Sequence, residues 1–315
     1  MGLRKNQANL TAAEKTAFVN AVLALKNNVP SKMGLAGRYD DYVQVHMNSM
    51  MAETATMPGW AHRASAFLAW HREFLRHFEL DLQNIDPTVT IPYWEWTINQ
   101  DPTGFWPGSP FTNDFMGGDG DLTEGKVSTG PFAFSTGHWK LNVTDPPPGD
   151  VSVYLRREFG RNVGTLPTMV RLEVALSETL YDVSPWNATS ASGLRNRLEG
   201  WIPTGTGTND SPPQLHNRVH VWVGGTMLGM TSLNDPIFWL NHCNIDRQWA
   251  IWQLRHPTAE KYVPVSGGPT GHNLNDTMIF FSGGPAPWPD TSTPAGVVNH
   301  HALGYRYDTD PTPST

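Results

Sequence analysis

His216 and His220 lie four residues apart in the segment LHNRVH, which spans positions 215 to 220. On an α-helix this spacing places both imidazoles on one face, a turn apart, where a single metal ion can bind them. The pair alone is a weak indication, because two partly buried histidines bonded to the backbone or to water would show the same spacing. Its weight depends on the other histidines of the chain.

Three further histidines lie in apolar stretches with helical spacing. His242 follows the segment DPIFWLN, His71 lies within FLAWHREF, and His46 shares a helical face with tyrosine, valine and methionine. Each imidazole is therefore expected in the stripe of its helix that faces the core. Burying a polar ring without a partner costs roughly 1–3 kcal/mol. A hydrogen bond explains one such residue, whereas several on converging helices are better explained by a shared metal.

The sixth histidine, His62, stands nine residues before His71 and has no place in a helical pattern. We expect it on the loop that leads into the helix of His71. Two spacings, from His62 to His71 and from His216 to His220, indicate histidines that act together. With His46 and His242 on separate helices, they predict two groups of three imidazoles.

The type of ligand narrows the choice of metal. Imidazole suits copper, zinc, iron and nickel, while carboxylate-rich sets suit manganese, magnesium or calcium. No Asp or Glu falls at ligand spacing, and Asn217 stands where a zinc protease would carry its catalytic glutamate. All-imidazole coordination leaves open positions on redox-active ions. Two copper ions that each give one electron could therefore bind O2 between them.

The elements that must position these histidines are mainly helical. The fold expected is a mainly α bundle with a core of four principal helices that holds the dicopper site, long irregular loops and little strand. The four helices are expected at Thr11–Asn27, Arg38–Met51, Ser65–Ile85 and Asp235–Trp252. Thr11 with Glu14 predicts a capping box, and Asp235-Pro236 is typical of a helix start.

The remaining segments are expected to be shorter or irregular. A short helix is predicted at Gln214–Val223, ending at Gly224-Gly225. The segments Thr97–Asp150 and Pro203–Pro213 are rich in glycine and proline, which predicts surface loops. Ile91–Trp96 is expected to be extended.

Composition excludes several classes of function. The net charge of −7 argues against a nucleic-acid partner, and no run of about 18 apolar residues is present to span a membrane. Cys243 is the only cysteine, so neither an intrachain disulfide nor a cysteine-built zinc site is possible. The start of the chain has no apolar signal-peptide core. We therefore expect a cytoplasmic protein as encoded, with export alongside a carrier partner left open.

The sequence resembles the bacterial tyrosinases, of the type-3 dicopper oxidase family, over nearly its whole length. The resemblance rests on the motifs RKN (4–6), FLAWHREFL (67–75), PYWEW (92–96), LEGW (198–201), LHNRVH (215–220), VGG (223–225) and NDPIFWL (234–240). It implies that one copper ion is bound by His46, His62 and His71. It implies that the other is bound by His216, His220 and His242.

The resemblance also implies an activity. Family members use O2 as co-substrate to hydroxylate monophenols to catechols and to oxidise o-diphenols to o-quinones, so small phenols are the expected substrates. Glu199 and Asn217 match a pair that holds a water able to take the phenol proton. Such a base is needed because a phenol has a pKa of about 10. The simpler interpretation is a surface acid and a solvent-facing amide.

Four further positions are expected at the substrate pocket. Phe238 matches an aromatic residue over the pocket that stacks on the substrate ring or stiffens a ligand, although core packing would also explain it. Val221 matches a position at the entrance, and Met227 falls in the adjacent loop, where packing is an equal explanation. Many relatives have a second histidine where this chain has Asn241, which affects the surroundings of the second copper.

The resemblance sets the expected organisation as well. Residues 1–315 are expected to form one catalytic domain, with no C-terminal lid domain and with activity after copper loading without proteolysis. The segment GYRYD (304–308) resembles a tyrosine motif that closes the core against Arg4. In fungal relatives a thioether bond links a cysteine to one histidine ligand of the first copper. Cys243 lies in a different part of the sequence, so no such bond is expected here. Some relatives use a helper protein that delivers copper, and one is a possible partner here.

Three alternatives stay open. The first is a catechol or o-aminophenol oxidase with little monophenol hydroxylation. The asparagine at position 241 is compatible with this alternative, whereas Glu199 and Asn217 argue against it. The second is an O2 carrier resembling haemocyanin. The third is a helical protein with core histidines and no metal. Melanin-like pigment formation and secondary-metabolite synthesis are both compatible with the sequence.

Overall fold

The structure is a computed structural model of the chain. It describes residues 1–54, 58–98, 101, 103–146, 149, 151–201, 213–280, 287–288 and 291–311. Helices dominate these residues, and the strands among them are two short segments of three residues each. The mainly α fold with little strand that the sequence predicts is therefore confirmed.

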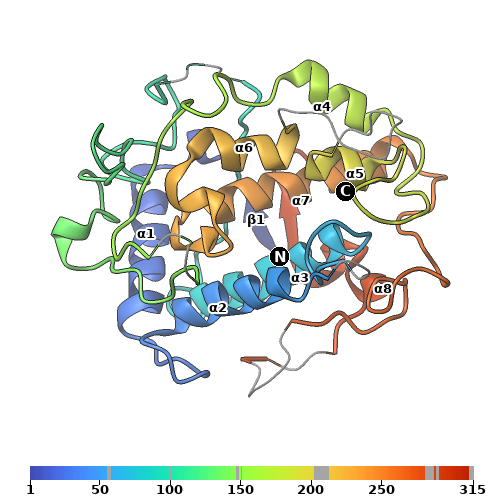
Figure 1. The fold of residues 1–315 in the computed structure, drawn as a ribbon, viewed down its shortest axis with the longest axis horizontal. Helices are drawn as coiled ribbons and strands as arrows, with labels where there is room; N and C mark the ends of the chain where they lie inside the picture. Colours follow the sequence, from blue (N-terminus) through green and yellow to red (C-terminus); the bar gives the residue numbers. More distant parts are fainter. Residues whose placement is uncertain are drawn as a thin grey trace.

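Four helices surround the histidines: α2 (Arg38–Met51), α3 (Phe67–Gln83), α6 (Leu215–Val223) and α7 (Ile237–Arg255). The helix α7 is central and packs against both α3 and α6 (Figure 1). The helix α1 (Ala12–Asn27) packs on α2 and α3 and carries none of the histidines. The four helices that carry histidines are therefore α2, α3, α6 and α7, and the short α6 stands among them where α1 was expected. The helix α1 instead supports α2 and α3.

The ends of these helices follow their local chemistry. Thr11 caps α1 in a capping box, in which its hydroxyl accepts from the Glu14 backbone N–H and the Glu14 carboxylate accepts from the Thr11 N–H. At α7, the Asp235 side chain accepts from the Ile237 N–H at 3.1 Å, and Pro236 already has helical dihedral angles. The helix α3 is shorter at both ends than expected, and α7 runs on to Arg255.

Several short helices were not predicted. They are α4 (Met169–Leu176), α5 (Leu194–Glu199) and α8 (Pro294–Val297), with the 3-10 turns η1 (Gln7–Asn9), η2 (Phe134–Thr136), η3 (Gly225–Leu228), η4 (Ser232–Asn234) and η5 (His300–Leu303). The helix α5 lies between Gly193 and Gly200, whose φ angles are 107° and 113°. A Cβ on Gly200 would lie 2.1 Å from the Gln214 carbonyl oxygen, so only glycine lets α5 lie this close to the start of α6.

The two strands join distant parts of the sequence. β1 (Gly2–Arg4) pairs in parallel with β2 (Tyr305–Tyr307), with Arg4 opposite Tyr307. The Arg4 guanidinium lies 3.5 Å from the centroid of the Tyr305 ring and bonds to Glu79 at 2.9 Å. The expected closure of the tyrosine motif against Arg4 is confirmed.

The predicted irregular segments behave as expected where they are described. Between Thr97 and Thr144 the only helix or strand among the described residues is the 3-10 turn η2, beside isolated bridges at Gly120, Lys126 and Val127. Tyr93 forms an isolated parallel bridge with Asn6. The predicted loop Pro203–Pro213 lies outside the described residues except for Pro213. Among the described helices, none is both long and apolar enough to cross a membrane.

Candidate metal centre

The structure brings the six predicted histidines together from four helices and one loop. His46 lies on α2, His71 on α3, His216 and His220 on α6, and His242 on α7. His62 lies in the segment between α2 and α3, as expected. The histidines form two triads, and within each triad one ring nitrogen of every residue lies within 4.8 Å of those of the other two. The first triad is His46, His62 and His71, and the second is His216, His220 and His242.

The two triads adjoin each other. The rings of His71 and His242, one from each triad, stack with their centroids 4.2 Å apart and an interplanar angle of 24°. His62 and His216 also approach across the boundary, with ring centroids 6.1 Å apart. The six imidazoles therefore form one continuous cluster and not two remote sites.

Backbone carbonyls orient four of the rings. The Nδ1 atoms of His46, His71, His216 and His220 lie 3.0, 2.8, 3.2 and 2.8 Å from the carbonyl oxygens of Met230, Phe67, Glu199 and Met227. An Nδ1–H that donates to a carbonyl fixes the tautomer and leaves the Nε2 lone pair free. This is the arrangement that a metal-binding histidine requires.

Three of these four Nε2 atoms lack a protein partner in the described part of the chain. Those of His46, His71 and His220 are buried without a hydrogen bond in the part of the chain that the structure describes. The Nε2 atoms of His216 and His242 face each other at 3.1 Å. Two imidazole nitrogens bound to one tetrahedral ion at about 2.0–2.1 Å would lie roughly 3.3 Å apart. Six nitrogen donors and no carboxylate suit copper, so the residues present fit two copper ions.

Burial keeps the imidazoles neutral. Loss of water contact lowers the pKa of His46 to about 3 and that of His220 to about 4, although the Met230 and Met227 carbonyls oppose the fall. Burial also lowers the pKa of the other four rings well below the usual value. At neutral pH each ring can offer a lone pair to a cation without first losing a proton.

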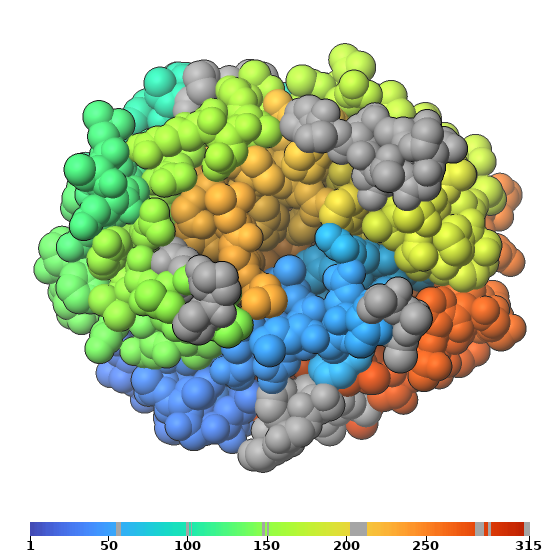
Figure 2. Space-filling model, in the orientation of Figure 1, coloured from blue at the N-terminus to red at the C-terminus, as the bar shows by residue number. Residues whose placement is uncertain are grey.

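The triads open onto a cavity of about 400 Å³. In Figure 2 the surface is hollowed where α6 and the loop after it (gold) face α2 and the segment after it (blue). The lining includes four of the histidines with Glu53, Arg63, Glu199, Trp201, Asn217, Val221, Met227 and Leu228. A second cavity, of about 530 Å³, lies at the N-terminus and holds none of the six histidines.

Two of the four predicted pocket residues line the cavity, and two do not. Val221 and Met227 do so, as expected. Phe238 is fully buried and stacks on His242 with centroids 4.0 Å apart, so its ring is covered by the imidazole it supports. Asn241 is also fully buried, and its side-chain oxygen accepts from the Trp96 indole N–H at 3.1 Å. Both belong to the packing behind the second triad.

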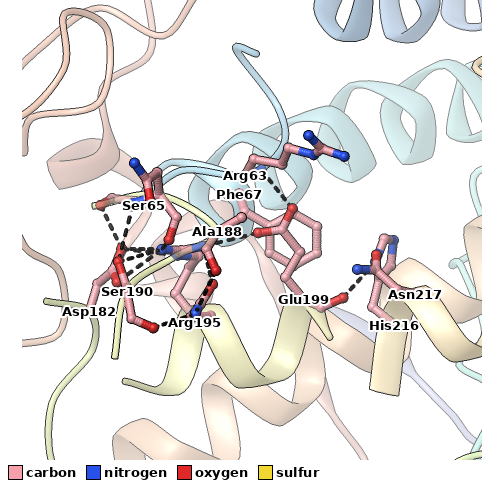
Figure 3. A network of polar contacts seen from close by, with 12 residues as sticks. Arg63, Ser65, Phe67, Asp182, Ala188, Ser190, Arg195, Glu199, His216 and Asn217 are labelled. Carbon is pink, nitrogen blue, oxygen red and sulfur yellow. Dashed lines mark hydrogen bonds and ion pairs between the residues drawn. The ribbon is translucent and has the colours of Figure 1, made fainter. Parts of the chain in front are cut away.

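Glu199 lies at the C-terminal end of α5, where a buried polar network holds it (Figure 3). Its Oε1 accepts from the Arg63 backbone N–H at 2.6 Å and its Oε2 from Arg195 Nη1 at 3.1 Å. Arg195 also bonds to both carboxylate oxygens of Asp182. Burial raises the pKa of the Glu199 carboxyl, and the Arg195 guanidinium opposes that rise.

Asn217 lies on the same side of the cavity as Glu199. Its Oδ1 is 2.9 Å from Nδ1 of His216, and both Asn217 and Glu199 line the cavity. The Glu199 backbone oxygen bonds to that same imidazole nitrogen. Both residues of the candidate proton-accepting pair therefore contact a histidine of the second triad, Asn217 through its side chain and Glu199 through its backbone oxygen.

Sequence reasoning missed the groups that act through the backbone. The carbonyls of Met227 and Met230 orient one histidine in each triad, and no pattern in the sequence indicates a role for either carbonyl. The carbonyl of Phe67 could have been found, because it lies four residues before His71 on the predicted helix. Arg63 and Trp201 also line the cavity, and their only signals in the sequence are adjacency to His62 and membership of the LEGW motif.

Comparisons with known proteins agree with this geometry. Residues 36–255 match the family described as the common central domain of tyrosinase. The chain is 44% identical to a tyrosinase of Streptomyces glaucescens over 98% of this chain and 100% of that protein. It is 39% identical to grixazone synthase of Streptomyces griseus over 97% of this chain and 99% of that protein.

Solved structures share the fold. A mutant polyphenol oxidase of Thermothelomyces thermophila aligns with a TM-score of 0.70 and 22% identity over 98% of this chain and 88% of that one. Deoxygenated hemocyanin of Rapana thomasiana aligns with a TM-score of 0.61 and 20% identity over 98% of this chain and 69% of that one. Taken with the sequence matches and the two histidine triads, they lead to one conclusion. The chain belongs to the tyrosinase family of copper-dependent phenol-oxidising enzymes.

Proposed function

We propose that this protein uses O2 to hydroxylate monophenols and to oxidise o-diphenols to o-quinones. The observation that carries the proposal is that two adjoining histidine triads open onto one cavity of about 400 Å³. A cavity of this size suits a small aromatic molecule. One monophenol and one O2 would give one o-quinone and one water. Two o-diphenols and one O2 would give two o-quinones and two waters.

The two triads would each hold one copper ion, with His46, His62 and His71 at the first and His216, His220 and His242 at the second. Copper bound there would supply one-electron redox chemistry at two neighbouring positions, which suits the two-electron oxidation of a diphenol. The chain's own part is to keep six neutral imidazoles fixed. Their burial and their carbonyl partners support that role.

The phenol must lose its proton before its oxygen can approach a cation. We assign this step to a water held by the Glu199 carboxylate and the Asn217 amide, which would take the proton from the phenol oxygen. Both residues line the cavity beside His216. Burial raises the pKa of the Glu199 carboxyl, which makes its carboxylate a stronger proton acceptor, while the Arg195 guanidinium and the Arg63 N–H oppose that rise and favour the charged form.

The test uses the uncleaved chain, loaded with free Cu²⁺, with tyramine and catechol as substrates. Oxygen uptake and quinone absorbance measure turnover. We expect Glu199→Gln to lower kcat for tyramine by about 10²-fold or more. The loss should be much smaller for an acidic nitrocatechol, whose hydroxyl ionises readily without a base. Asn217→Ala should show the same ordering of substrates.

Glu53→Gln serves as the matched control, because Glu53 lines the same cavity but lies at its exposed rim. It should leave both activities near those of the unchanged protein. Equal losses for tyramine and nitrocatechol would contradict the assignment of Glu199. A chain that binds two copper ions and oxidises neither substrate would overturn the proposed function as a whole.

The same assay separates the alternatives. Turnover of catechol or o-aminophenol without tyramine hydroxylation would indicate the narrower oxidase, and reversible O2 uptake without quinone would indicate a carrier. Activity of the uncleaved chain after loading with free copper would agree with two further expectations. These are that no proteolysis is needed and that a copper-delivery helper protein is not obligatory.

A further inference from the structure

A third cluster of ligand-type side chains lies outside the two triads. His300 and His301 begin the turn η5, and Asp310 follows the strand β2. The Nε2 atoms of His300 and His301 lie 2.8 and 2.9 Å from the same oxygen of Asp310, Oδ2. Like the triads, this cluster offers three ligand atoms within 4.8 Å of one another.

The donor set and its spacing fit a transition-metal cation. Two imidazoles and one carboxylate are the ligands that zinc, nickel and copper accept, while calcium and magnesium prefer oxygen alone. In a tetrahedral zinc site with bonds of about 2.0–2.2 Å, neighbouring ligand atoms lie roughly 3.4 Å apart. The two measured distances are shorter by about half an ångström, so a small outward movement of each imidazole would admit an ion.

The surroundings favour such a movement and hold the carboxylate in place. The side chain of His301 is 48% exposed, while those of His300 and Asp310 are 8% and 3% exposed. His301 can therefore swing toward solvent, and an ion can enter from that side. The Tyr307 backbone N–H donates to Asp310 Oδ2 at 2.9 Å, which orients the oxygen as outer partners orient metal ligands.

Asp310 is charged at neutral pH. Burial would raise the pKa of its carboxyl, but the hydrogen bonds from His300, the Tyr307 N–H and His301 outweigh it and lower the pKa to about 2. A buried carboxylate oxygen that two imidazole nitrogens face places three donor atoms around one point. The simpler explanation is a hydrogen-bonded clip, in which both imidazoles donate to Asp310 and no cation binds.

We propose that His300, His301 and Asp310 bind one divalent cation of the zinc, nickel and copper group, separately from the two triads. The cation would replace the two imidazole–carboxylate hydrogen bonds, and each imidazole would bind it through an unprotonated Nε2. Because Asp310 follows β2 and the histidines lie on η5, the bound ion would fix the end of the β1–β2 pair.

The experiment titrates Zn²⁺ into protein whose copper content has first been measured and brought to two equivalents. Calorimetry should detect one further equivalent, and elemental analysis after desalting should find zinc beside undiminished copper. We expect His301→Asn to weaken this binding at least tenfold. The thermal midpoint should rise with Zn²⁺ in the unchanged protein and not in the variant.

His138→Asn is the matched control, because His138 is an exposed histidine outside all three clusters. It should bind zinc like the unchanged protein. Asp310→Asn should also lose the site; if it does not fold, His301→Asn decides alone because its side chain is half exposed. Absence of the extra equivalent, or equal binding by His301→Asn, would overturn the proposal and leave the hydrogen-bonded clip.

Discussion

The phenyl ring of Phe238 lies against the imidazole of His242, with centroids 4.0 Å apart and an interplanar angle of 25°. The same ring meets His46 nearly edge to face at 5.1 Å, so it touches one histidine of each triad. Because Phe238 is fully buried, its volume holds both imidazoles in place from behind.

Replacing Phe238 should therefore affect stability and metal content together. Phe238→Ala leaves a cavity and should lower the free energy of unfolding by about 3–5 kcal/mol. Copper retained after dialysis should fall, since His242 can then change its ring orientation. Denaturant unfolding and elemental analysis measure the two effects. Phe105→Ala, at a phenylalanine that is 66% exposed, should change stability by less than about 1 kcal/mol; similar losses in both variants would contradict the prediction.

Arg195 connects two buried carboxylates, those of Asp182 and Glu199. Arg195→Met should lower the free energy of unfolding by about 3–5 kcal/mol, because it leaves both acids buried without a cation. Denaturant titration gives the value. Arg255→Met removes an exposed ion pair with Glu173 and should cost at most about 1 kcal/mol. A loss of at most about 1 kcal/mol in Arg195→Met would contradict the prediction, because it would mean that water solvates the two carboxylates in place of the guanidinium.

Asp246, on α7, meets two arginines and two tyrosines. Its carboxylate accepts from Arg72 at 2.5 Å, from Arg4 at 3.3 Å and from Tyr305 at 2.6 Å. Burial alone would raise the pKa of Asp246, but the two guanidiniums hold it below the usual value.

Asp246→Asn should thus destabilise the fold by about 3–5 kcal/mol, since Arg72 loses its buried counter-charge and Arg4 keeps only Glu79. Amide hydrogen exchange should show faster opening of the β1–β2 pair than in the unchanged protein. The exposed Asp86→Asn provides the comparison. Unchanged exchange at β1 in Asp246→Asn would separate this network from the closure of the strands.

His272 predicts a pH dependence that does not involve the metal ligands. Burial, helped by nearby Arg195 and opposed by Asp276, lowers its pKa to about 4. The unfolded chain binds the proton near pH 6.5, so stability is full above that pH and falls as the pH drops toward 4. Between pH 7.5 and 5 the loss from this group is about 2 kcal/mol.

The measurement compares copper-loaded protein with His272→Gln by denaturant unfolding at pH 7.5 and 5. The variant should lack this part of the acid sensitivity, although it starts from its own stability at pH 7.5. The same difference between the two pH values in both proteins would mean that His272 does not carry the effect.

Much of the fold could be predicted because its helices carry local signals. The capping box of Thr11 and Glu14, the start at Asp235-Pro236 and the stop at Gly224 each depend on neighbours within a few residues. The short helix α5 could not be found this way, because it has six residues and depends on packing against α6.

The site was predictable to a different depth for different residues. His216 and His220 share a helical face, so their spacing alone predicts that they pair. His62 lies on a loop, and its own position in the sequence does not indicate which histidines it joins. The resemblance left two roles open for Phe238, contact with the substrate ring or support of a ligand, and its stacking on His242 favours the second, while Asn241 is bonded to Trp96 behind the second triad. A motif indicates that a residue lies near the histidines, but only tertiary packing decides whether it faces the cavity or lies behind the imidazoles.

One loop serves both triads, because the Met227 carbonyl bonds to His220 and the Met230 carbonyl bonds to His46. The spacing of two cations bound by the triads would therefore depend in part on the conformation of a few consecutive residues. An insertion or deletion between Met227 and Met230 would move His46 and His220 at once, so this short connection links the geometry of one triad to that of the other.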